Sequence, residues 1–466
     1  MRNTLRRLIP AVYCVTACTT LLAQDEGQLQ SDFRREGAEI SKDCTAVKTI
    51  FGCLQELVTG QPLHFTAGSI APQNGVGFGG AFVFDKNYGE SWRTSTNADA
   101  VVSTNGSWRA GAYLKLIRTS TQTPTPVVIT TRPAPGTTPP PPELKPVPEF
   151  NVYVQAASLN KVDYYGLGPF TSRSSLASFG MTEVVLGGNV TYPVLGSSGL
   201  ALYGELNGRW VDIRGRHGDS IPSIERLYSN ATAPGLAQQP AFFQPAEGVK
   251  FVRGFSDRLQ LNYSATMQEF VAVSESQYSF GRLNLDFNHD IPLYRNQRSM
   301  PPRPNVGPDE SPDVLVNPQR FTRNREGSIG LRALWVQSFI PDGNVVPFYF
   351  QPTLGGADIA GDKMLASFPD YRFRAPNLLL FRASIEHSIW GPVGAMFMAD
   401  TGRVALTHSD LGFDHFRHSY AAGLTLRAGG FPMVQLLFAW GGGEGTHIFA
   451  NINPSILGGG ARPSLY

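Results

Sequence analysis

The feature that most restricts the fold of this chain is a period of two that recurs from residue 62 to the C-terminal region. In LLFRASIEHSIW, residues 379–390, the apolar Phe381 and Ile385 alternate with the polar Arg382 and Glu386. Such alternation is typical of a β-strand with one apolar and one polar face. In a soluble sandwich the apolar face forms a core, whereas in an outer-membrane barrel it meets lipid and the polar face lines a lumen.

The same pattern predicts sixteen strands, an even number, and most are near the roughly 9–11 residues that a tilted strand needs to cross a membrane. The predicted strands are 62–71, 77–85, 92–104, 107–119, 150–160, 180–193, 200–213, 258–273, 278–291, 327–340, 345–353, 377–389, 393–405, 418–428, 431–442 and 446–453.

The connections between these strands favour the barrel over the sandwich. If the chain enters the first strand from the periplasm, the connections after odd strands face outward and several are long, whereas most of those after even strands are tight. The long ones are 161–179, 214–257, 292–326, 354–376 and 406–417; the tight ones are 194–199, 274–277, 341–344, 390–392 and 429–430. Outer-membrane barrels have this asymmetry. The predicted fold class is an all-β, transmembrane antiparallel β-barrel of 16 strands with a short N-terminal helix.

One predicted connection breaks this rule. The connection after the fourth strand, residues 120–149, should be short. It is instead a proline-rich insertion that contains a run of four prolines. Such a run favours an extended polyproline II conformation. An inserted spacer, a docking arm for a periplasmic protein and a strand count that is wrong by one all remain open.

The N-terminal residues 1–23 resemble an export signal, with a cationic start and a largely apolar stretch that ends at Ala23. Cleavage after Ala23 competes with lipidation of Cys18, which lies in a sequence resembling a lipoprotein cleavage box. We expect residues 24–61 to form a periplasmic segment with an amphipathic helix, and residues 62–466 to form the barrel.

Two cysteines of this segment, Cys44 and Cys53, remain after cleavage at Ala23, and export permits a disulfide between them. Within one continuous helix, nine residues turn about 900° and place the two side chains on opposite faces. A disulfide therefore requires a break in the helix, near Gly52 or Thr45, and both the bonded and the free form stay open.

The composition and motifs point away from several functions. With 16% charged residues and a formal net charge of +2, the chain has no basic excess that would indicate a nucleic-acid partner. We find no HExxH, no CxxC pair and no GxSxG elbow, so we predict no metal, no cofactor and no enzymatic activity. His387 and Ser388 are adjacent on a strand and point to opposite faces, which excludes them as a nucleophile and base pair.

The last third of the chain resembles the outer-membrane assembly-factor superfamily, also called bacterial surface antigen barrels. The resemblance rests on the order and spacing of five stretches: Leu354–Gly356, Tyr371–Arg374, Glu386, Met398–Gly402 and Tyr420–Arg427. It implies that residues 354–376 form a lid loop that enters the lumen. It also implies that Gly355, Gly356 and Gly423 are structural glycines, and that lid and lumen contacts involve Phe368, Arg372, Arg374, Glu386, Asp400 and Gly402.

The chain departs from this family at two points. The lid signature aligns with residues 365–368, where Ala366 replaces the arginine that fastens the lid in the family, so we expect Arg372 or Arg374 to face Asp400 and Glu386 instead. A literal Val252–Phe255 match to that signature lies outside the expected loop, and we interpret it as a coincidence. Residues 24–61 are also too few for the periplasmic POTRA domains that receive substrates in the family.

The resemblance implies a barrel in the bacterial outer membrane that inserts or translocates proteins there. Its partners would be outer-membrane lipid, client outer-membrane proteins and a periplasmic factor. The alternatives are a small-solute channel or structural barrel and, on the basis of Cys18, a lipoprotein-anchored surface adhesin. The sequence names neither a client nor a solute, and it leaves the oligomeric state open.

Overall fold

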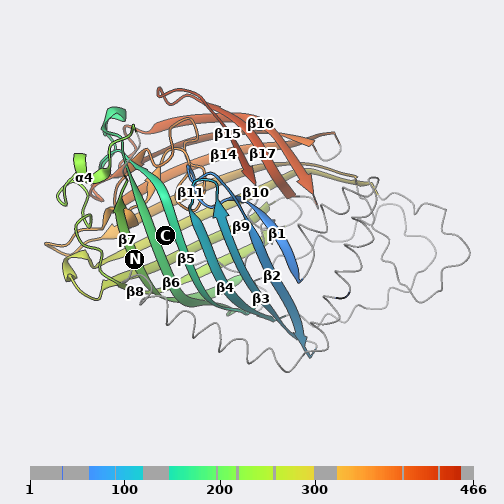
Figure 1. Cartoon of the computed structure of the whole chain (residues 1–466). Helices are drawn as coiled ribbons and strands as arrows, with labels where there is room; N and C mark the ends of the chain where they lie inside the picture. Colours follow the sequence, from blue (N-terminus) through green and yellow to red (C-terminus); the bar gives the residue numbers. More distant parts are fainter. Residues whose placement is uncertain are drawn as a thin grey trace, which may run out of the picture.

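The computed structural model describes residues 62–89, 91–118, 146–195, 198–216, 220–255, 259–298, 323–390, 393–428 and 431–452, together with Arg34. These residues form one antiparallel sheet of 16 strands and a second sheet of two short strands (Figure 1). The predicted all-β class is confirmed. The predicted signal segment, N-terminal helix, Cys18, Cys44 and Cys53, and nearly all of 120–149, lie outside the described residues.

The strands of the large sheet follow one another in space in the order of the chain. They are β1 (Leu63–Ser69), β2 (Val76–Tyr88), β3 (Trp92–Ser103), β4 (Trp108–Arg118), β5 (Glu149–Tyr164), β6 (Ala177–Pro193), β7 (Leu200–Gly215), β8 (Phe242–Phe255), β9 (Leu259–Ala272), β10 (Phe280–Arg298), β11 (Arg323–Phe339), β14 (Asn377–Trp390), β15 (Val393–Ala405), β16 (Arg417–Ala428), β17 (Phe431–Trp440) and β18 (His447–Ile452). The small sheet pairs β12 (Thr353–Leu354) with β13 (Phe373–Arg374). The short helices are η3 (Arg173–Ser175), α4 (Ile224–Leu227), η6 (Ser276–Tyr278) and η7 (Phe348–Phe350).

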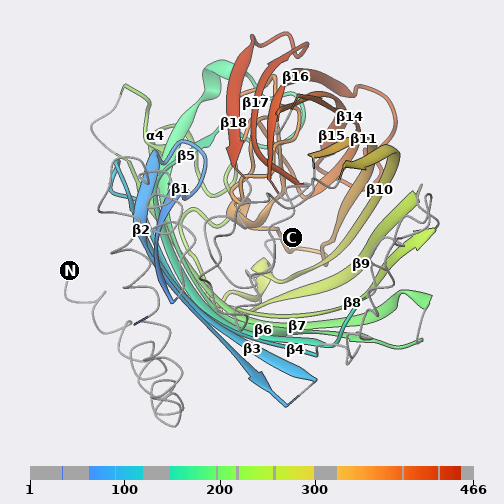
Figure 2. The ribbon, with the colours of Figure 1, turned by 90° about the vertical axis from the view of Figure 1, so that its right-hand side faces the viewer.

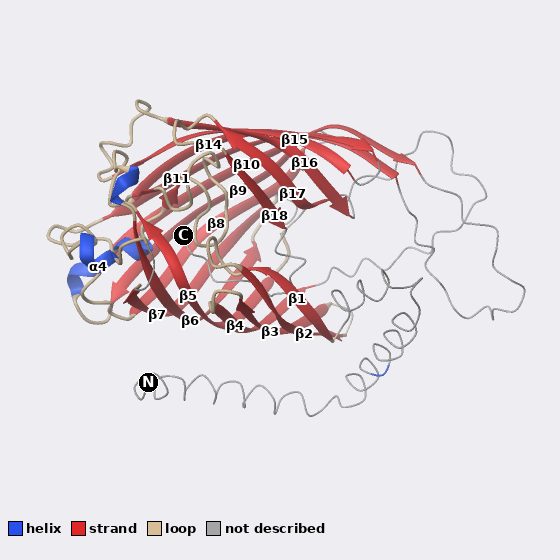
Figure 3. Ribbon diagram, turned by 45° about the horizontal axis from the view of Figure 1, so that its top comes forward, coloured by secondary structure: helices blue, strands red, loops and turns tan. Residues whose placement is uncertain are grey.

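The sheet curls round on itself, so that its first and last strands come to lie on the same side of the molecule (Figures 2 and 3). Every strand of the large sheet from β2 to β17 pairs with a neighbour on each side. Among the described residues, β1 and β18 are the first and last strands of this order. We call these two the edge strands.

Alternation along each strand separates the two faces as the sequence indicates. On β7, the outward Leu206 and Trp210 are 51% and 46% exposed, whereas the inward Arg209 is 1% exposed. On β10, Arg282 and Asn284 are likewise buried inside the curve of the sheet. The outer face is thus broadly apolar, and charged side chains gather on the inner face.

Two predicted segments are wrong, and their errors compensate in the strand count. Residues 242–255 form β8, although the sequence analysis placed them in a connection. Pro245 and Gly248 gave this segment the appearance of a turn, because proline cannot donate to a ladder and glycine weakens a strand. Conversely, 345–353 is not a strand of the large sheet: Phe348, Tyr349 and Phe350 are all buried in the turn η7, which is not the pattern of a strand with one exposed face.

These two errors move several connections to the other end of the sheet. With β8 counted, β10 is the tenth strand and no longer the ninth. The chain therefore leaves β10 at the end of the sheet opposite the one expected for 292–326. Residues 273–279 and 340–376 instead lie at the end that carries 165–176, 216–241 and 406–416, which we call the loop end. The predicted tight turns 274–277 and 341–344 therefore belong to the loop end.

Candidate functional site

The connection between β11 and β14, residues 340–376, folds back inside the curve of the sheet (Figure 2), and we call it the inner connection. Its first part packs rings against inward side chains of β5 to β10. The ring centroid of Phe348 lies 5.2 Å from that of Tyr164 and 5.1 Å from that of Phe179. Phe350 lies 4.9 Å from Phe242 and 5.1 Å from Phe270.

We call Phe348, Tyr349 and Phe350 the aromatic plug. The three rings belong to the largest apolar cluster of the described residues, to which β5, β6, β7, β8, β9 and β10 all contribute. Burial raises the pKa of Tyr349, and the nearby Tyr278 raises it further, so the phenol stays neutral at physiological pH. The loop end of the space inside the sheet is therefore occupied largely by aromatic rings, with Arg282 and Arg374 donating to backbone carbonyls of the plug.

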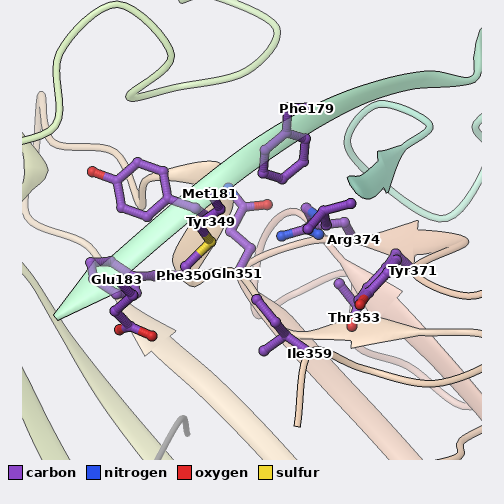
Figure 4. Close-up of a pocket in the computed structure, with 11 residues that line it drawn as sticks. Phe179, Met181, Glu183, Tyr349, Phe350, Gln351, Thr353, Ile359, Tyr371 and Arg374 are labelled. Atoms are coloured by element: carbon purple, nitrogen blue, oxygen red, sulfur yellow. The ribbon is translucent and has the colours of Figure 1, made fainter. Parts of the chain in front are cut away.

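A small cavity of about 30 Å³ remains beside the aromatic plug (Figure 4). Its walls include Glu183, Arg374 and Tyr371 together with rings of the plug. The plug therefore packs closely against the wall at this point.

The second part of the inner connection packs against the opposite wall. Leu365, Phe368 and Phe373 share an apolar cluster with Leu378 and Leu380, which point inward from β14. The rings of Phe368 and Phe373 meet edge to face at 5.2 Å. The inner connection is therefore held between two sides of the sheet, with β5–β10 on one side and β11, β14 and β15 on the other.

Asp400 of β15 is the most buried carboxylate in this wall, with a side chain that is 1% exposed. Its Oδ1 accepts a hydrogen bond from Nε of Arg382 at 2.7 Å, and its Oδ2 accepts one from Nη2 at 3.0 Å. Oδ2 also accepts the backbone N–H of Leu365 at 2.9 Å. Arg382 in turn donates to the carbonyl of Lys363. The pair thus holds the inner connection by its backbone.

The expectation that Arg372 or Arg374 faces Asp400 is wrong. Arg382 occupies this place because it lies directly opposite Asp400 in the β14–β15 register, on the same face of the sheet. The register shifts between Ser388 and Trp390, so counting outward from Trp390 and Val393 would place Ala383, not Arg382, opposite Asp400.

The two predicted arginines bind elsewhere at the loop end. Arg372 donates from Nε to Oε2 of Glu444 at 2.7 Å, and Arg374 donates from Nη1 to the carbonyl of Phe348 at 2.7 Å. Glu386 accepts a hydrogen bond from the hydroxyl of Thr425 at 2.8 Å.

A second charged group lies towards the other end of the sheet. Arg332 of β11 donates to both oxygens of Asp286 at 3.0 Å and to Oδ2 of Asp362 at 2.7 Å. It borders a cavity of about 600 Å³ that Lys363 and Met396 also line. The sequence analysis did not identify Arg332 and Asp362, because neither residue belongs to a recognisable motif.

The predicted glycines have close neighbours that explain them. Gly355 and Gly356 have φ angles of +101° and +63°, and a Cβ on Gly356 would lie 2.5 Å from the backbone of Asp370. A Cβ on Gly402 would lie 2.6 Å from the carbonyl oxygen of Leu379, and one on Gly423 would lie 2.0 Å from that of Leu436. Glycine lets the neighbouring backbones approach at each position.

The literal signature Val252–Phe255 lies at the end of β8 opposite the loop end. Arg253 is exposed there, and its guanidinium sits 4.9 Å from the ring centroid of Phe255. Val252 lines the same cavity of about 600 Å³ as Asp362 and Lys363 of the inner connection.

Searches for metal sites and membrane helices cover the described residues alone. Within them, no three His, Cys, Asp or Glu side chains gather as ligands for a metal ion. No helix among them is long and apolar enough to cross a membrane.

Comparisons with known proteins give three solved structures of similar architecture. BamA from Haemophilus ducreyi lacking POTRA domains 1-3 has 12% identity and a TM-score of 0.47, and the match covers 83% of this chain and 68% of that one. CdiB from Acinetobacter baumannii has 12% identity, a TM-score of 0.42 and coverages of 81% and 55%. CdiB from Escherichia coli has 12% identity, a TM-score of 0.45 and coverages of 81% and 58%.

This chain spans little more than half the length of either CdiB chain. No family model matches the sequence, and no curated protein does. At this identity and these TM-scores, the likeness says nothing about activity, which has to follow from the contacts within the chain itself.

Proposed function

We propose that this protein is a bacterial outer-membrane β-barrel that inserts or translocates other proteins, with its two edge strands as the template. The observation that carries the proposal is a curled sheet whose first and last strands, β1 and β18, lie on the same side and whose inside is occupied by residues 340–376. Separation of these two strands would offer N–H and C=O groups to which another strand can add. The clients would be outer-membrane proteins, delivered by a periplasmic factor.

The outer face of the sheet supports a location in the membrane. Large apolar side chains stand exposed along it, such as Val152 at 59% and Leu424 at 52%. A continuous apolar surface of this kind marks a binding surface for a partner or a membrane. Lipid is the partner that covers the whole circumference of a barrel. The proposal keeps residues 1–23 as a signal, 24–61 as a periplasmic segment and 62–466 as the barrel.

The inner connection separates this proposal from its main alternative, a small-solute channel. The aromatic plug fills the loop end of the space inside the sheet, and Asp400 holds the rest of the connection against the opposite wall. We propose that this packing interrupts the continuous aqueous path that a channel for free diffusion needs. We therefore propose that residues 354–376 act as a lid. Its Phe368 packs against the wall, and Arg372, Arg374 and Asp400 help to hold it in place.

The test places the purified protein in liposomes and adds a urea-denatured, unrelated eight-stranded outer-membrane barrel as the client. We expect the client to reach its heat-modifiable folded form several times faster than in empty liposomes or in liposomes carrying an unrelated closed barrel. The same liposomes should swell slowly in a small sugar. Rapid swelling with no acceleration of folding would favour the channel, and the absence of both effects would leave a structural barrel.

A further inference from the structure

Two arginines on the inner face of the sheet are bound to the wall in the same way. Arg332 of β11 and Arg382 of β14 lie directly opposite one another in the strand register. Arg332 donates from Nε and Nη2 to the two oxygens of Asp286, both at 3.0 Å. Arg382 donates from the same two nitrogens to Asp400, at 2.7 and 3.0 Å. Each guanidinium thus holds one wall carboxylate in bidentate fashion and keeps Nη1 for a further acceptor.

Asp362 of the inner connection meets both of these Nη1 atoms. Its Oδ2 accepts a hydrogen bond from Nη1 of Arg332 at 2.7 Å, and its Oδ1 lies 3.9 Å from Nη1 of Arg382. Like charges that face one another on paired strands repel, so an anion between the two arginines stabilises their arrangement. Asp286 and Asp400 belong to strands of the wall, whereas Asp362 belongs to a connection. Of the three carboxylates, Asp362 is therefore the one that can leave without moving a strand.

Asp362 lies at the tip of a turn that is less buried than the segments on either side. The N–H of Asp362 donates to Oδ1 of Asp358 at 2.8 Å, and the N–H of Asp358 donates to the carbonyl of Asp362 at 3.0 Å. Residues 359–363 are partly or fully exposed, whereas 354–358 and 364–368 are buried. The side chain of Asp362 is itself 38% exposed. The tip can therefore lift from the wall while the rest of the inner connection stays packed.

The cavity of about 600 Å³ beside Asp362 combines cationic and apolar side chains. Arg332 and Arg382 contribute the cationic part of its lining, and Met396 and Leu437 contribute to the apolar part. Binding sites of this kind fix a ligand through a few polar groups and gain affinity from apolar contact. The lining therefore suits a ligand that carries a carboxylate next to an apolar group.

We infer that Arg332 and Arg382 form a carboxylate-binding site that Asp362 occupies from within the chain, and that an acidic side chain of another polypeptide can replace it there. The exchange conserves charge, because one carboxylate takes the place of another. Asp362 is tethered to the site and competes at a high effective concentration, so a free carboxylate has to be present at millimolar levels. That the other polypeptide is a client rests on the proposed function, whereas the carboxylate site itself does not.

The probe for this site is benzoate, which joins a carboxylate to an apolar ring, and benzamide is its uncharged control. Trypsin cleavage after Lys363 in the detergent-solubilised full-length protein, followed by mass spectrometry, reports how often the tip leaves the wall. We expect millimolar sodium benzoate to raise the cleavage rate of the parent chain by at least about threefold, in a saturable manner, relative to sodium chloride of equal ionic strength. Benzamide should leave the rate unchanged.

Asp362→Asn separates binding from release. This variant lacks the internal carboxylate, so trypsin should cleave it rapidly with or without benzoate. Saturation-transfer NMR should show that benzoate binds to it at least about five times more tightly than to the parent chain. Adding Arg332→Gln to this variant should abolish the binding, because one of the two Nη1 donors is then lost.

Asp85→Asn is the matched control, because it removes a carboxylate from an arginine pair on β2 and β3 instead. It should keep the benzoate response of the parent chain. Heat-modifiable mobility on gels verifies that each variant is folded.

A cleavage rate that benzoate leaves unchanged, or that benzamide raises equally, would overturn the carboxylate site. Equal affinity of the parent chain and of Asp362→Asn for benzoate would overturn it as well. These outcomes are distinct from failure of the proposed function, which shows as the absence of client folding in liposomes. A carboxylate site in a protein without assembly activity would still stand, with a ligand that is not a client.

Discussion

Replacing Asp400 by asparagine is expected to release the inner connection to protease. The substitution removes the charge that balances Arg382 within a buried wall and weakens the acceptor for Leu365. Breaking a buried ion pair by removing one partner costs about 3–5 kcal/mol. Since each 1.4 kcal/mol changes an equilibrium about tenfold, the population of the open loop should rise by at least about ten times. Trypsin cleavage after Lys363, followed by mass spectrometry, reports this opening.

The control for this prediction is Asp85→Asn. Asp85 pairs with Arg93 on β2 and β3, but the arginine side chain is 48% exposed, and such a surface pair contributes about 0–1 kcal/mol. Trypsin should cleave this control after Lys363 at the same rate as it cleaves the parent chain. Equal cleavage after Lys363 in the parent chain and in Asp400→Asn would show that Asp400 does not hold the inner connection.

Replacing Phe348 by alanine is expected to open the loop end to ions. Phe348 is 0% exposed and contacts the rings of Tyr164, Phe179 and Tyr349. Truncating a buried phenylalanine costs about 3–5 kcal/mol through lost burial and the cavity left behind. We expect frequent open bursts in planar-bilayer recordings, whereas the parent protein should remain mostly closed.

Phe170→Ala is the matched control for the aromatic plug, because Phe170 lies at the same end of the sheet but is 71% exposed. Its loss should change neither the conductance nor the resistance to unfolding. A Phe348→Ala variant that is as closed as the parent chain would mean that the aromatic plug is not what closes the space inside the sheet.

Much of the fold could be predicted because an alternating pattern carries its own geometry. The β14–β15 pair is an example: its apolar and polar parities and the Gly-Pro in its sequence indicate both strands and both faces, although the register shifts between Ser388 and Trp390. Segments that depart from a simple alternation were not predictable in this way. β8 contains Pro245 and Gly248, and its identity depends on pairing with β7 and β9, which are not read from local sequence.

The aromatic plug was misread for the opposite reason. VVPFYFQPT has the β-branched and aromatic residues of a strand, yet its rings are buried by long-range contacts with β5, β6, β8 and β9. Within the candidate site, Asp400 could be singled out by resemblance, but its partner could not, because a motif names residues and not pairs. The partner of Arg372 could not be predicted either, because Glu444 is 72 residues away and belongs to no motif.

The measurement that most directly tests the central claim is site-specific photo-crosslinking of the edge strands to a client in living cells. A photoreactive amino acid replaces Phe65 on β1, Ile448 on β18 or, as the control, Leu186 on β6, all of which are exposed on the outer face. We predict adducts with outer-membrane proteins during their synthesis at Phe65 and Ile448, and none at Leu186. Adducts that are absent from both edges, or equally frequent at Leu186, would contradict assembly on the edge strands.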